Sequence, residues 1–418
     1  MKQQEGYIYR RNKFWFVRFY DDVMQGDGTI RRVQLAKKLT AYSDQFRSVK
    51  SVRSLAQDHL RPINSGKLDV RSTMAVAQFI EKTYLPEIEE TKRASTLKDY
   101  KDIFRVHVKA RLGEISLRDF RTVDGEELLK TIARQAKTKH GAPLRHSTLA
   151  RIKSFLSGVF TVAKRKGVLD SINPMVNVSV PAGAPASTTY AYSLREIRAM
   201  LAVLSEPAKT VVLTAAFTGV RQGELRGLQW KNFDGRSLRV ERSVWRKGII
   251  NPPKGKALSA APIPVVKVLQ EALERLRLTM GVLSHSDLPI FQSGEGTPLN
   301  LGNLAKRVII PKIEKCSKCG KSRAQHPVEG HLFALDTTLR WYGWHAFRRG
   351  LATNLHAAGI PDRDIQGILR HSNIAVTQAS YIKSLDEVQI GALDLVAEKL
   401  ASDESCTTYA PNSGERIN

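Results

Sequence analysis

Apolar and polar positions alternate along the first seventy residues, as they do in strands. Aromatic and β-branched residues gather in short runs at residues 7–9, 14–20 and 30–35. Alternating runs that are separated by Asp and Gly turns predict a small antiparallel sheet. A helix over residues 45–59 is expected to follow the sheet, and together they form the first predicted domain, residues 1–70.

The apolar positions take on a helical period after residue 70. The sequence predicts helices at 74–84, 95–108, 124–135 and 147–166. Ser147 is expected to cap the last helix and Gly167 to end it, because Ser favours helix starts and Gly favours helix ends. The pattern predicts an all-helical bundle over residues 71–180. The stretch 173–185 is rich in Pro, Gly and Ala, which indicates an interdomain linker. We place the linker itself at residues 181–187, after the bundle.

Residues 188–400 form the third predicted domain. An apolar helix is broken by Gly219, and two strand-like runs, 237–244 and 260–264, flank a basic turn. A polar tail, residues 401–418, follows this domain. The predicted fold class is therefore multidomain and mainly α with small β-sheets (α+β).

Charge is the feature of composition that narrows the function most. The chain has 66 Lys and Arg against 40 Asp and Glu, which gives a net charge of +26. Residues 1–70, 71–187 and 188–418 carry +7, +9 and +10 of this excess. A protein this basic repels itself unless it binds a polyanion, and nucleic acid is the default partner. The alternative is a generally basic, soluble surface.

Cysteine content and hydropathy indicate the compartment. Three cysteines in 418 residues are too few for a disulfide scaffold and fit a reducing compartment. The sequence has no apolar run of about eighteen residues, and its polar first residues lack the apolar segment of a signal peptide. We therefore expect a soluble protein of the cytoplasm with no membrane partner.

Basic side chains decorate two of the predicted elements. On the sheet they are Arg10, Arg11, Arg18, Arg31 and Arg32, and on the last helix of the bundle they include Arg151, Lys153 and Lys164. A ribbon of strands fits the major groove of DNA, so these positions predict DNA-binding surfaces. The alternative for the sheet is a small capping structure whose arginines are solvated.

Six polar side chains after residue 188 could serve one reaction. They are Arg221 on the turn after Gly219, Lys254 in the basic turn, His345 and Arg348 one helical turn apart, and then His371 and Tyr381. Each is weak alone, because an arginine at a helix start is usually a surface group and a lysine at a hairpin tip is usually solvated.

This combination of groups suits phosphoryl transfer on DNA without a metal ion. Two guanidinium groups can hold the non-bridging oxygens of a phosphodiester in its transition state, as a metal ion would otherwise do. A tyrosine can attack the phosphorus and form a covalent ester that conserves the energy of the bond. Lysine or histidine can protonate the departing 5′-oxygen. The set therefore predicts a strand-transfer reaction that needs neither a metal ion nor ATP.

The order of these six residues, with the run Thr218-Gly219-Val220-Arg221-Gln222-Gly223-Glu224-Leu225, resembles the tyrosine recombinase (phage integrase) family. The resemblance extends over nearly the whole chain. It implies a three-stranded arm-binding domain, a helical core-binding domain and a tyrosine recombinase catalytic domain.

The resemblance also implies the role of each residue. Arg221 and Arg348 would hold the scissile phosphate, and Tyr381 would attack it to form a 3′-phosphotyrosyl link. Lys254 would be the general acid, and Lys256 remains an alternative two residues on. The remaining assignments are assistance in proton transfer by His345, a hydrogen bond to the phosphate from His371, and orientation of the arginine turn by Glu224. His371 and Tyr381 lie ten positions apart, one more than in many family members.

The family resemblance implies a site-specific recombinase that integrates or excises a phage or another mobile element. It implies double-stranded DNA with core and arm sites as the partner, and a homotetramer on that DNA. A host DNA-bending protein and a directionality factor are further expected partners, and the nucleoid of a bacterial host is the expected location. The alternatives are a type IB topoisomerase-like relaxase, or a DNA-binding regulator without activity.

One motif lies outside the family pattern. Cys316, Cys319, His326 and His331 have the spacing C-x2-C-x6-H-x4-H within residues 314–333. Paired Cys and His ligands suit a tetrahedral zinc ion, so the motif predicts a structural zinc knuckle without a role in catalysis. The alternative is a loop with reduced thiols and surface histidines.

Overall fold

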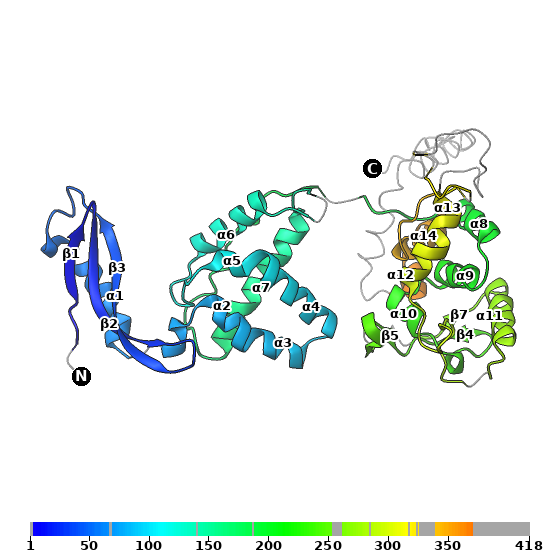
Figure 1. The fold of residues 1–418 in the computed structure, drawn as a ribbon, viewed down its shortest axis with the longest axis horizontal. Coiled ribbons are helices and arrows are strands. Elements are labelled where there is room, and N and C mark those ends of the chain that lie inside the picture. The colour runs from blue at the N-terminus through cyan, green and yellow to red at the C-terminus, as the bar shows by residue number, and fades with distance from the viewer. Residues whose placement is uncertain are drawn as a thin grey trace, which may run out of the picture. The chain divides into compact units, whose positions relative to one another are not determined.

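We describe the fold from a computed structural model of the chain. The residues described are 3–66, 69–138, 141–185, 188–252, 261–283, 286–316, 318–322, 325 and 339–370. The chain divides into two compact units, Met1–Ser187 and Thr188–Asn418 (Figure 1). The described elements are mainly helices with small sheets, as the sequence predicts.

The first unit begins with an antiparallel sheet whose strands lie in the order β1-β2-β3. The strands are β1 (Tyr7–Arg11), β2 (Phe14–Met24) and β3 (Ile30–Ala41), and helix α1 (Val49–Asn64) follows. Val17 and Phe19 of the sheet pack against Ala56 and Leu60 of α1 in a small hydrophobic cluster. The helix begins at Val49 rather than at the predicted residue 45, because Ser48 caps it through a reciprocal hydrogen bond with Ser51.

The rest of the first unit is helical. Its α-helices are α2 (Val76–Phe79), α3 (Leu85–Thr91), α4 (Ala94–Ile103), α5 (Lys109–Leu112), α6 (Thr122–Gln135) and α7 (His146–Arg165). Wide π-helical turns at Ile80–Tyr84 and Phe104–Val108 join α2 to α3 and α4 to α5. The helical stretch continues through the first of these turns into α3, past the predicted end at residue 84. Pro86 lies in the first turn of α3, where a proline is tolerated because its missing N–H would have no partner within the helix. Arg145, and not the predicted Ser147, is the residue that precedes α7.

The stretch predicted as a linker packs partly onto this helical core. Met175 and Val178 are buried in the same hydrophobic cluster as the helices. The Ala184 N–H donates to the Leu144 carbonyl at 2.9 Å, and a side chain at Gly183 would meet the backbone of His146. Two apolar residues three apart are too short a pattern to predict burial from sequence. That residues 181–187 form a linker between domains remains a prediction.

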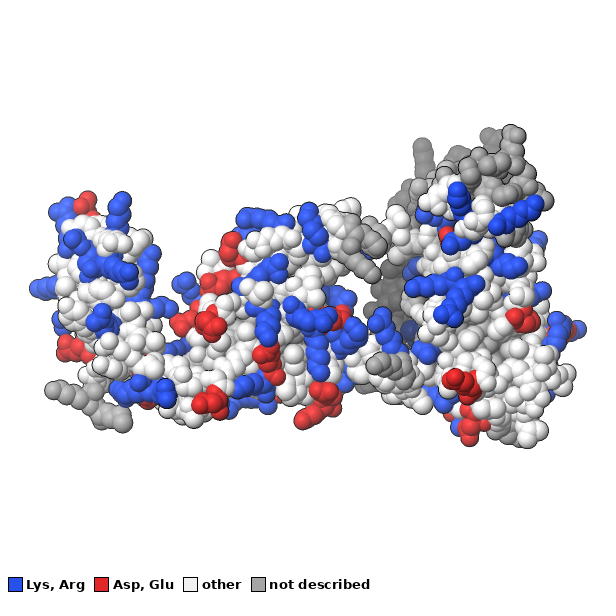
Figure 2. Space-filling model, viewed as in Figure 1, with Lys and Arg blue, Asp and Glu red and all other residues white. Residues whose placement is uncertain are grey.

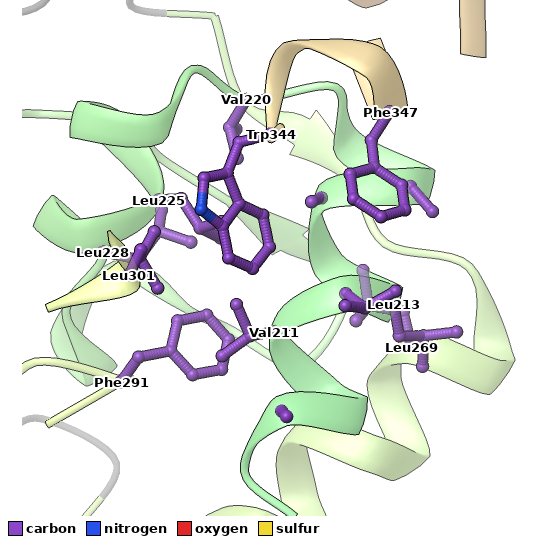
Figure 3. Packing of buried hydrophobic residues seen from close by; sticks show 14 of the residues in the cluster. Val211, Leu213, Val220, Leu225, Leu228, Leu269, Phe291, Leu301, Trp344 and Phe347 are labelled. Carbon is purple, nitrogen blue, oxygen red and sulfur yellow. The ribbon is translucent and has the colours of Figure 1, made fainter. Parts of the chain in front are cut away.

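The described part of the second unit has a main hydrophobic core and a smaller cluster of Ala352, Ile365 and Leu369. Its α-helices are α8 (Leu194–Val203), α9 (Ala208–Thr218), α10 (Gln222–Gly227), α11 (Lys267–Met280), α12 (Leu301–Leu304), α13 (Ile310–Glu314), α14 (His345–Ala357) and α15 (Asp362–Leu369). Figure 3 shows Trp344 and Phe347, at the start of α14, lying among Val211, Leu225 and Phe291 of this core. This packing fixes the first turn of α14, on which two of the predicted site residues lie.

Short strands replace the two longer runs that the sequence predicts in this unit. They are β4 (Ser237–Leu238), β5 (Ser243–Val244), β6 (Ile250–Asn251) and β7 (Ile263–Pro264). β4 pairs with β7 and β5 pairs with β6, so the run 237–244 contributes to two separate ribbons. Among the helices in the described ranges, none has the length and apolar character needed to cross a membrane.

Candidate active site

The turn between α9 and α10 places Arg221. Gly219 ends α9 in the left-handed conformation, with φ of 58°, and a Cβ at this position would lie 2.7 Å from a methyl carbon of Leu369. Only glycine fits both the conformation and the close contact. Arg221 then precedes the first turn of α10 in extended conformation, and 26% of its side chain remains exposed.

Glu224 holds this turn together. Its carboxylate accepts the Arg221 N–H at 3.1 Å and the Arg221 Nη1 at 2.8 Å. The residue is only 1% exposed. Burial raises the pKa of Glu224, but the neighbouring Arg370 and Arg221 outweigh it and lower the pKa below its ordinary value. The carboxylate is therefore charged at neutral pH and forms two hydrogen bonds with Arg221.

Arg348 lies against the same turn from α14. Its Nη1 donates to the Gly219 carbonyl at 2.5 Å, and its Nη2 donates to the Leu369 carbonyl. Burial, with a contribution from Arg221, lowers the pKa of Arg348 to about 9, which leaves it charged at neutral pH. The backbone carbonyls of α9 and α15 thus fix the direction of this guanidinium group.

His345 begins α14, one helical turn before Arg348, as the spacing predicts. Burial lowers its pKa, and the positive charges of Arg348, Arg349 and Arg221 lower it further. The imidazole is therefore neutral at pH 7, and one ring nitrogen is available to accept a proton.

Arg370 belongs to this cluster, and sequence analysis assigned it no role. It ends α15 with a positive φ of 55°, and its Nη2 donates to the second oxygen of Glu224 at 2.9 Å. In the sequence it is visible only as the residue before His371. Nothing in the pattern indicates that its side chain reaches a carboxylate 146 positions earlier.

Several of the predicted site residues lie outside the described residues. They are Lys254, Lys256, His326, His331, His371 and Tyr381. The described part of the cluster therefore consists of three arginines, one glutamate and one histidine. With Arg221 partly exposed beside a neutral histidine, it suits a phosphate that approaches from solvent.

The described part of the cysteine motif is a tight hairpin. The Gly320 N–H donates to the Cys316 carbonyl at 3.0 Å, and the Cys316 N–H donates to the Lys321 carbonyl at 3.0 Å. Gly320 has φ of 68°, Cys316 is buried and Cys319 is exposed. Within the described residues, no three Cys, His, Asp or Glu side chains form a group that could hold a metal ion.

The five predicted DNA-binding arginines of the sheet are all exposed. Strand alternation places Arg11, Arg18 and Arg32 on the face opposite to α1, which we call the open face, and places Arg10 and Arg31 on the other side. On the open face the Arg18 guanidinium lies 5.1 Å from the ring centre of Tyr9, which stacks on Phe16. Figure 2 shows Lys and Arg side chains spread over the drawn face of both units.

The basic residues of α7 differ in their partners. Arg151 forms an ion pair with Asp99, and Lys153 donates to the Val176 carbonyl at 3.2 Å. Lys164 is exposed. Two of these three cations therefore have partners within the first unit that a phosphate would have to replace or share.

Comparison with known proteins gives one consistent result. Residues 192–387 match the model of the phage integrase family. A tyrosine recombinase XerC-like protein of Caldanaerobacter subterraneus subsp. tengcongensis is 24% identical over 82% of this chain and 88% of its own length. An integrase of Streptomyces ambofaciens is 26% identical over 71% of this chain and 74% of its own length.

Solved structures share the fold. The integrase of the transposon Tn1549, in complex with transposon right-end DNA, covers 74% of this chain and 95% of its own, with a TM-score of 0.55 and 20% identity. A lambda integrase dimer bound to a core site covers 91% of this chain and 95% of its own, with a TM-score of 0.50 and 16% identity. The family match spans the cluster of Arg221, Glu224, His345, Arg348 and Arg370. Residues 192–387 therefore carry a phage integrase family domain, and most of the chain is similar to a tyrosine recombinase and an integrase.

Proposed function

We propose that this protein is the integrase of a phage or another mobile element, and that it recombines specific DNA sites through a 3′-phosphotyrosyl intermediate at Tyr381. The observation that carries this proposal is the buried Glu224, which holds Arg221 beside Arg348 and the neutral His345. Such a cluster would bind one phosphate and offer a proton acceptor next to it. The net charge of +26 supports DNA as the substrate.

The reaction begins when the phosphate binds to the two arginines. Arg221 and Arg348 donate hydrogen bonds to the non-bridging oxygens and stabilise the charge that develops on them. The Tyr381 oxygen attacks the phosphorus and loses its proton, for which the neutral His345 is a suitable acceptor. The bond from phosphorus to the 5′-oxygen breaks, and Lys254 supplies the proton that this oxygen takes up, with Lys256 as the alternative. His371 donates a further hydrogen bond to the phosphate.

Rejoining reverses these steps with a different strand. A 5′-hydroxyl from the partner site attacks the phosphotyrosyl bond, Tyr381 leaves, and no net bond energy is lost. All these steps use side chains, so the catalytic step needs no cofactor.

Exchange between two sites requires more than one protomer. We propose a homotetramer on core sites, with the open face of the sheet binding separate arm sites. The lambda integrase dimer bound to a core site is a precedent for assembly on DNA. A host DNA-bending protein and a directionality factor would complete the assembly at the nucleoid of a bacterial host.

Covalent capture tests the proposed function. Wild-type protein and Tyr381→Phe are incubated with a pool of duplexes whose central sequence is random, and covalent adducts are isolated under denaturing conditions. We expect wild-type protein to capture and enrich a defined sequence, and Tyr381→Phe to bind the same DNA without forming an adduct. Two copies of the enriched site should then yield recombinant products, whereas relaxation of supercoils without exchange would indicate a topoisomerase. The absence of any wild-type adduct would contradict the proposal.

We also propose a structural zinc ion bound by Cys316, Cys319, His326 and His331. The hairpin at Cys316–Gly320 supports it, because a C-x2-C pair followed by a glycine with positive φ suits a metal knuckle. Zinc here would stabilise the insertion and would take no part in strand cleavage.

Elemental analysis tests the zinc site. One zinc per chain is expected in the wild-type protein, and the double substitution Cys316→Ser, Cys319→Ser should lose both the metal and thermal stability, because metal binding is coupled to folding. Zinc-free wild-type protein with the same melting temperature as this variant would refute the site.

A further inference from the structure

Arg370 has a backbone conformation that residues with side chains rarely adopt. It follows the last turn of α15 with φ of 55° and ψ of 46°, and its N–H bonds to the carbonyls of Gln366 and Gly367. Helices commonly end in this left-handed conformation on a glycine, which has no Cβ to crowd the next carbonyl. An arginine at this position carries a backbone cost that a glycine would avoid. Its side chain therefore needs a compensating role.

The side chain of Arg370 reaches the buried carboxylate of Glu224. Its Nη2 lies 2.9 Å from Oε2 of Glu224, and the two side chains are 2% and 1% exposed. The other oxygen of Glu224 accepts the Nη1 of Arg221. One carboxylate is thus shared by two guanidinium groups, one from the start of α10 and one from the end of α15. Solvent screens these buried charges little, so a change in the position of Arg370 should strongly affect the position of Glu224.

The contact also fixes the end of α15 next to the second phosphate-binding arginine. Leu369, the neighbour of Arg370 in the chain, accepts a hydrogen bond from Arg348 Nη2. Gly219, at the other end of the same guanidinium, lies in contact distance of Leu369. Glu224 and Arg370 therefore join α10, which begins after Arg221, to the end of α15, whose last carbonyl accepts a hydrogen bond from Arg348.

We propose that Arg370 is a positioning residue for the phosphate site: it holds Glu224 in the orientation that aims Arg221, and it fixes the α15 carbonyl that aims Arg348. The proposal rests on the proposed function, because it assigns these arginines to phosphate binding. Arg370 itself would not touch the DNA.

The substitution Arg370→Gly separates the side chain from the backbone. Glycine suits the left-handed conformation better than arginine does, so a role confined to the backbone predicts unchanged or improved activity. The proposal predicts instead that DNA binding is retained while single-turnover cleavage falls about 10²-fold, because a misaimed phosphate clamp costs this much. Arg370→Lys keeps the charge without the planar fork and should lose less. Arg363→Gly, an exposed arginine on the same helix, is the matched control and should cleave normally.

The pH profile provides a readout that a general loss of structure would not produce. Arg221 faces Glu224 from the start of α10 and Arg370 faces it from α15, while Arg348 and His345 on α14 interact with it electrostatically. With Arg370 removed, only one arginine, Arg221, stays hydrogen-bonded to the buried carboxylate, and the pKa of Glu224 rises. The acid limb of cleavage in Arg370→Gly should therefore move to higher pH. Glu224→Gln removes the carboxyl that titrates, so the loss of cleavage in acid then depends on His345. Adding Arg370→Gly to Glu224→Gln should therefore not change the pH at which cleavage is lost.

The double variant completes the test. If Arg370 acts through Glu224, then Arg370→Gly with Glu224→Gln should cleave no more slowly than Glu224→Gln alone, and the melting temperatures of the four proteins should be non-additive. The probe is the duplex that wild-type protein enriches from the random pool. Arg370→Gly cleaving within twofold of wild type at every pH, or rate losses that multiply in the double variant, would overturn the proposal. If wild-type protein captures no DNA, the proposed function fails, and additive melting temperatures would then separately refute the contact between Arg370 and Glu224.

Discussion

The ion pairs of the two units differ most in their exposure to solvent. In the first unit, Arg47 pairs with Asp44 on side chains that are 67% and 92% exposed, and pairs such as Arg61 with Asp58 are similar. In the second unit, Glu224 and Arg370 are almost completely buried, and Arg221 shares the same carboxylate. Most ion pairs described in the first unit are thus exposed, with Arg118 and Asp21 at 16% and 10% as an exception, whereas the second unit contains a pair that is almost completely buried.

The contrast separates two uses of the same residue types. An exposed pair contributes about 0–1 kcal/mol to stability and is screened by salt, so its arginine can exchange a carboxylate for a DNA phosphate at little cost. A buried pair is different, because removal of one partner leaves an uncompensated charge and costs about 3–5 kcal/mol. We infer that the exposed charges of the first unit provide affinity and that the buried charges of the second provide geometry.

The largest effect is expected for Arg348 and Arg221, the two arginines proposed to bind the phosphate. Arg348→Ala should lower single-turnover cleavage about 10³-fold, because it removes donors aimed at the charge of the transition state, and Arg221→Ala should have a similar effect. The rate of covalent adduct formation with excess enzyme measures this loss. DNA affinity should change little, since the first unit retains its charge.

Arg363→Ala is the control for this prediction. It removes one exposed arginine from α15 and should leave cleavage unchanged. If it slowed cleavage as much as Arg348→Ala does, the distinction between buried and exposed charges would fail.

The general acid provides the next largest effect. Lys254→Ala should slow cleavage of ordinary DNA about 10²-fold or more, because the departing 5′-oxygen lacks a proton. With sulfur at the bridging 5′ position, the leaving thiolate has a conjugate acid with a pKa of about 8.5 and needs little acid catalysis, so cleavage should recover. Adduct formation on the two substrates is compared for each variant.

Three controls define the assignment of the acid. Sulfur should not restore cleavage by Tyr381→Phe or Arg348→Ala, which lack the nucleophile or the phosphate clamp. Rescue of Lys256→Ala in place of Lys254→Ala would move the acid two residues along the chain. If neither lysine variant is rescued, the role passes to another donor such as His345.

The sequence predicts the sheet of the first unit and the helix that carries His345 and Arg348, but it does not predict the bond between Arg370 and Glu224. Strand alternation predicts the sheet, and the spacing of His345 and Arg348 predicts their common helix, because both are local patterns. The bond between Arg370 and Glu224 joins residues 146 positions apart and depends on how α10 and α15 pack. Likewise, Met175 and Val178 are buried only because the helical core leaves space for them. Local periodicity carries no information about either.

An intermediate effect is expected for the open face of the sheet. Replacing Arg11, Arg18 and Arg32 with Ser should weaken binding to a random-sequence duplex and reduce the slope of log affinity against log salt by about 2.7, which corresponds to three phosphate contacts. Cleavage of a bound core site should be unaffected.

The matched control removes the same charge elsewhere in the first unit. Arg47, Arg53 and Arg61 lie before or on α1, and each pairs with an acidic residue. Their replacement with Ser should leave the salt slope nearly unchanged. Equal slopes for the two triple variants would refute a specific DNA-binding face.

One histidine in each unit predicts that acid lowers the stability of the protein. Burial lowers the pKa of His59 in the first unit and of His345 in the second below the ordinary value of 6.5. The unfolded chain therefore binds protons at a pH where the folded protein does not, and the free energy of unfolding should fall as pH drops below 6.5. Thermal melts between pH 7.5 and pH 5 should show this loss, and His59→Gln or His345→Gln should each reduce it. A stability that rises on acidification would contradict both pKa directions.

The smallest effect is expected at Arg151. This residue tests how little an exposed ion pair contributes in comparison with the buried pair of Glu224 and Arg370. The Arg151 side chain is 64% exposed and pairs with Asp99. Because solvent screens this pair, Arg151→Ala should change the free energy of unfolding by less than about 1 kcal/mol, as measured by urea denaturation. If Arg151 also binds a phosphate, the same substitution should reduce the salt slope of DNA binding by about 0.9. Asp99→Ala removes the acidic partner of Arg151. It should leave the slope of log affinity for DNA against log salt unchanged or make it steeper. A loss of stability of several kcal/mol in Arg151→Ala would mean that this surface pair behaves like the buried pair of Glu224 and Arg370, and that exposure does not divide the charges of this protein by use.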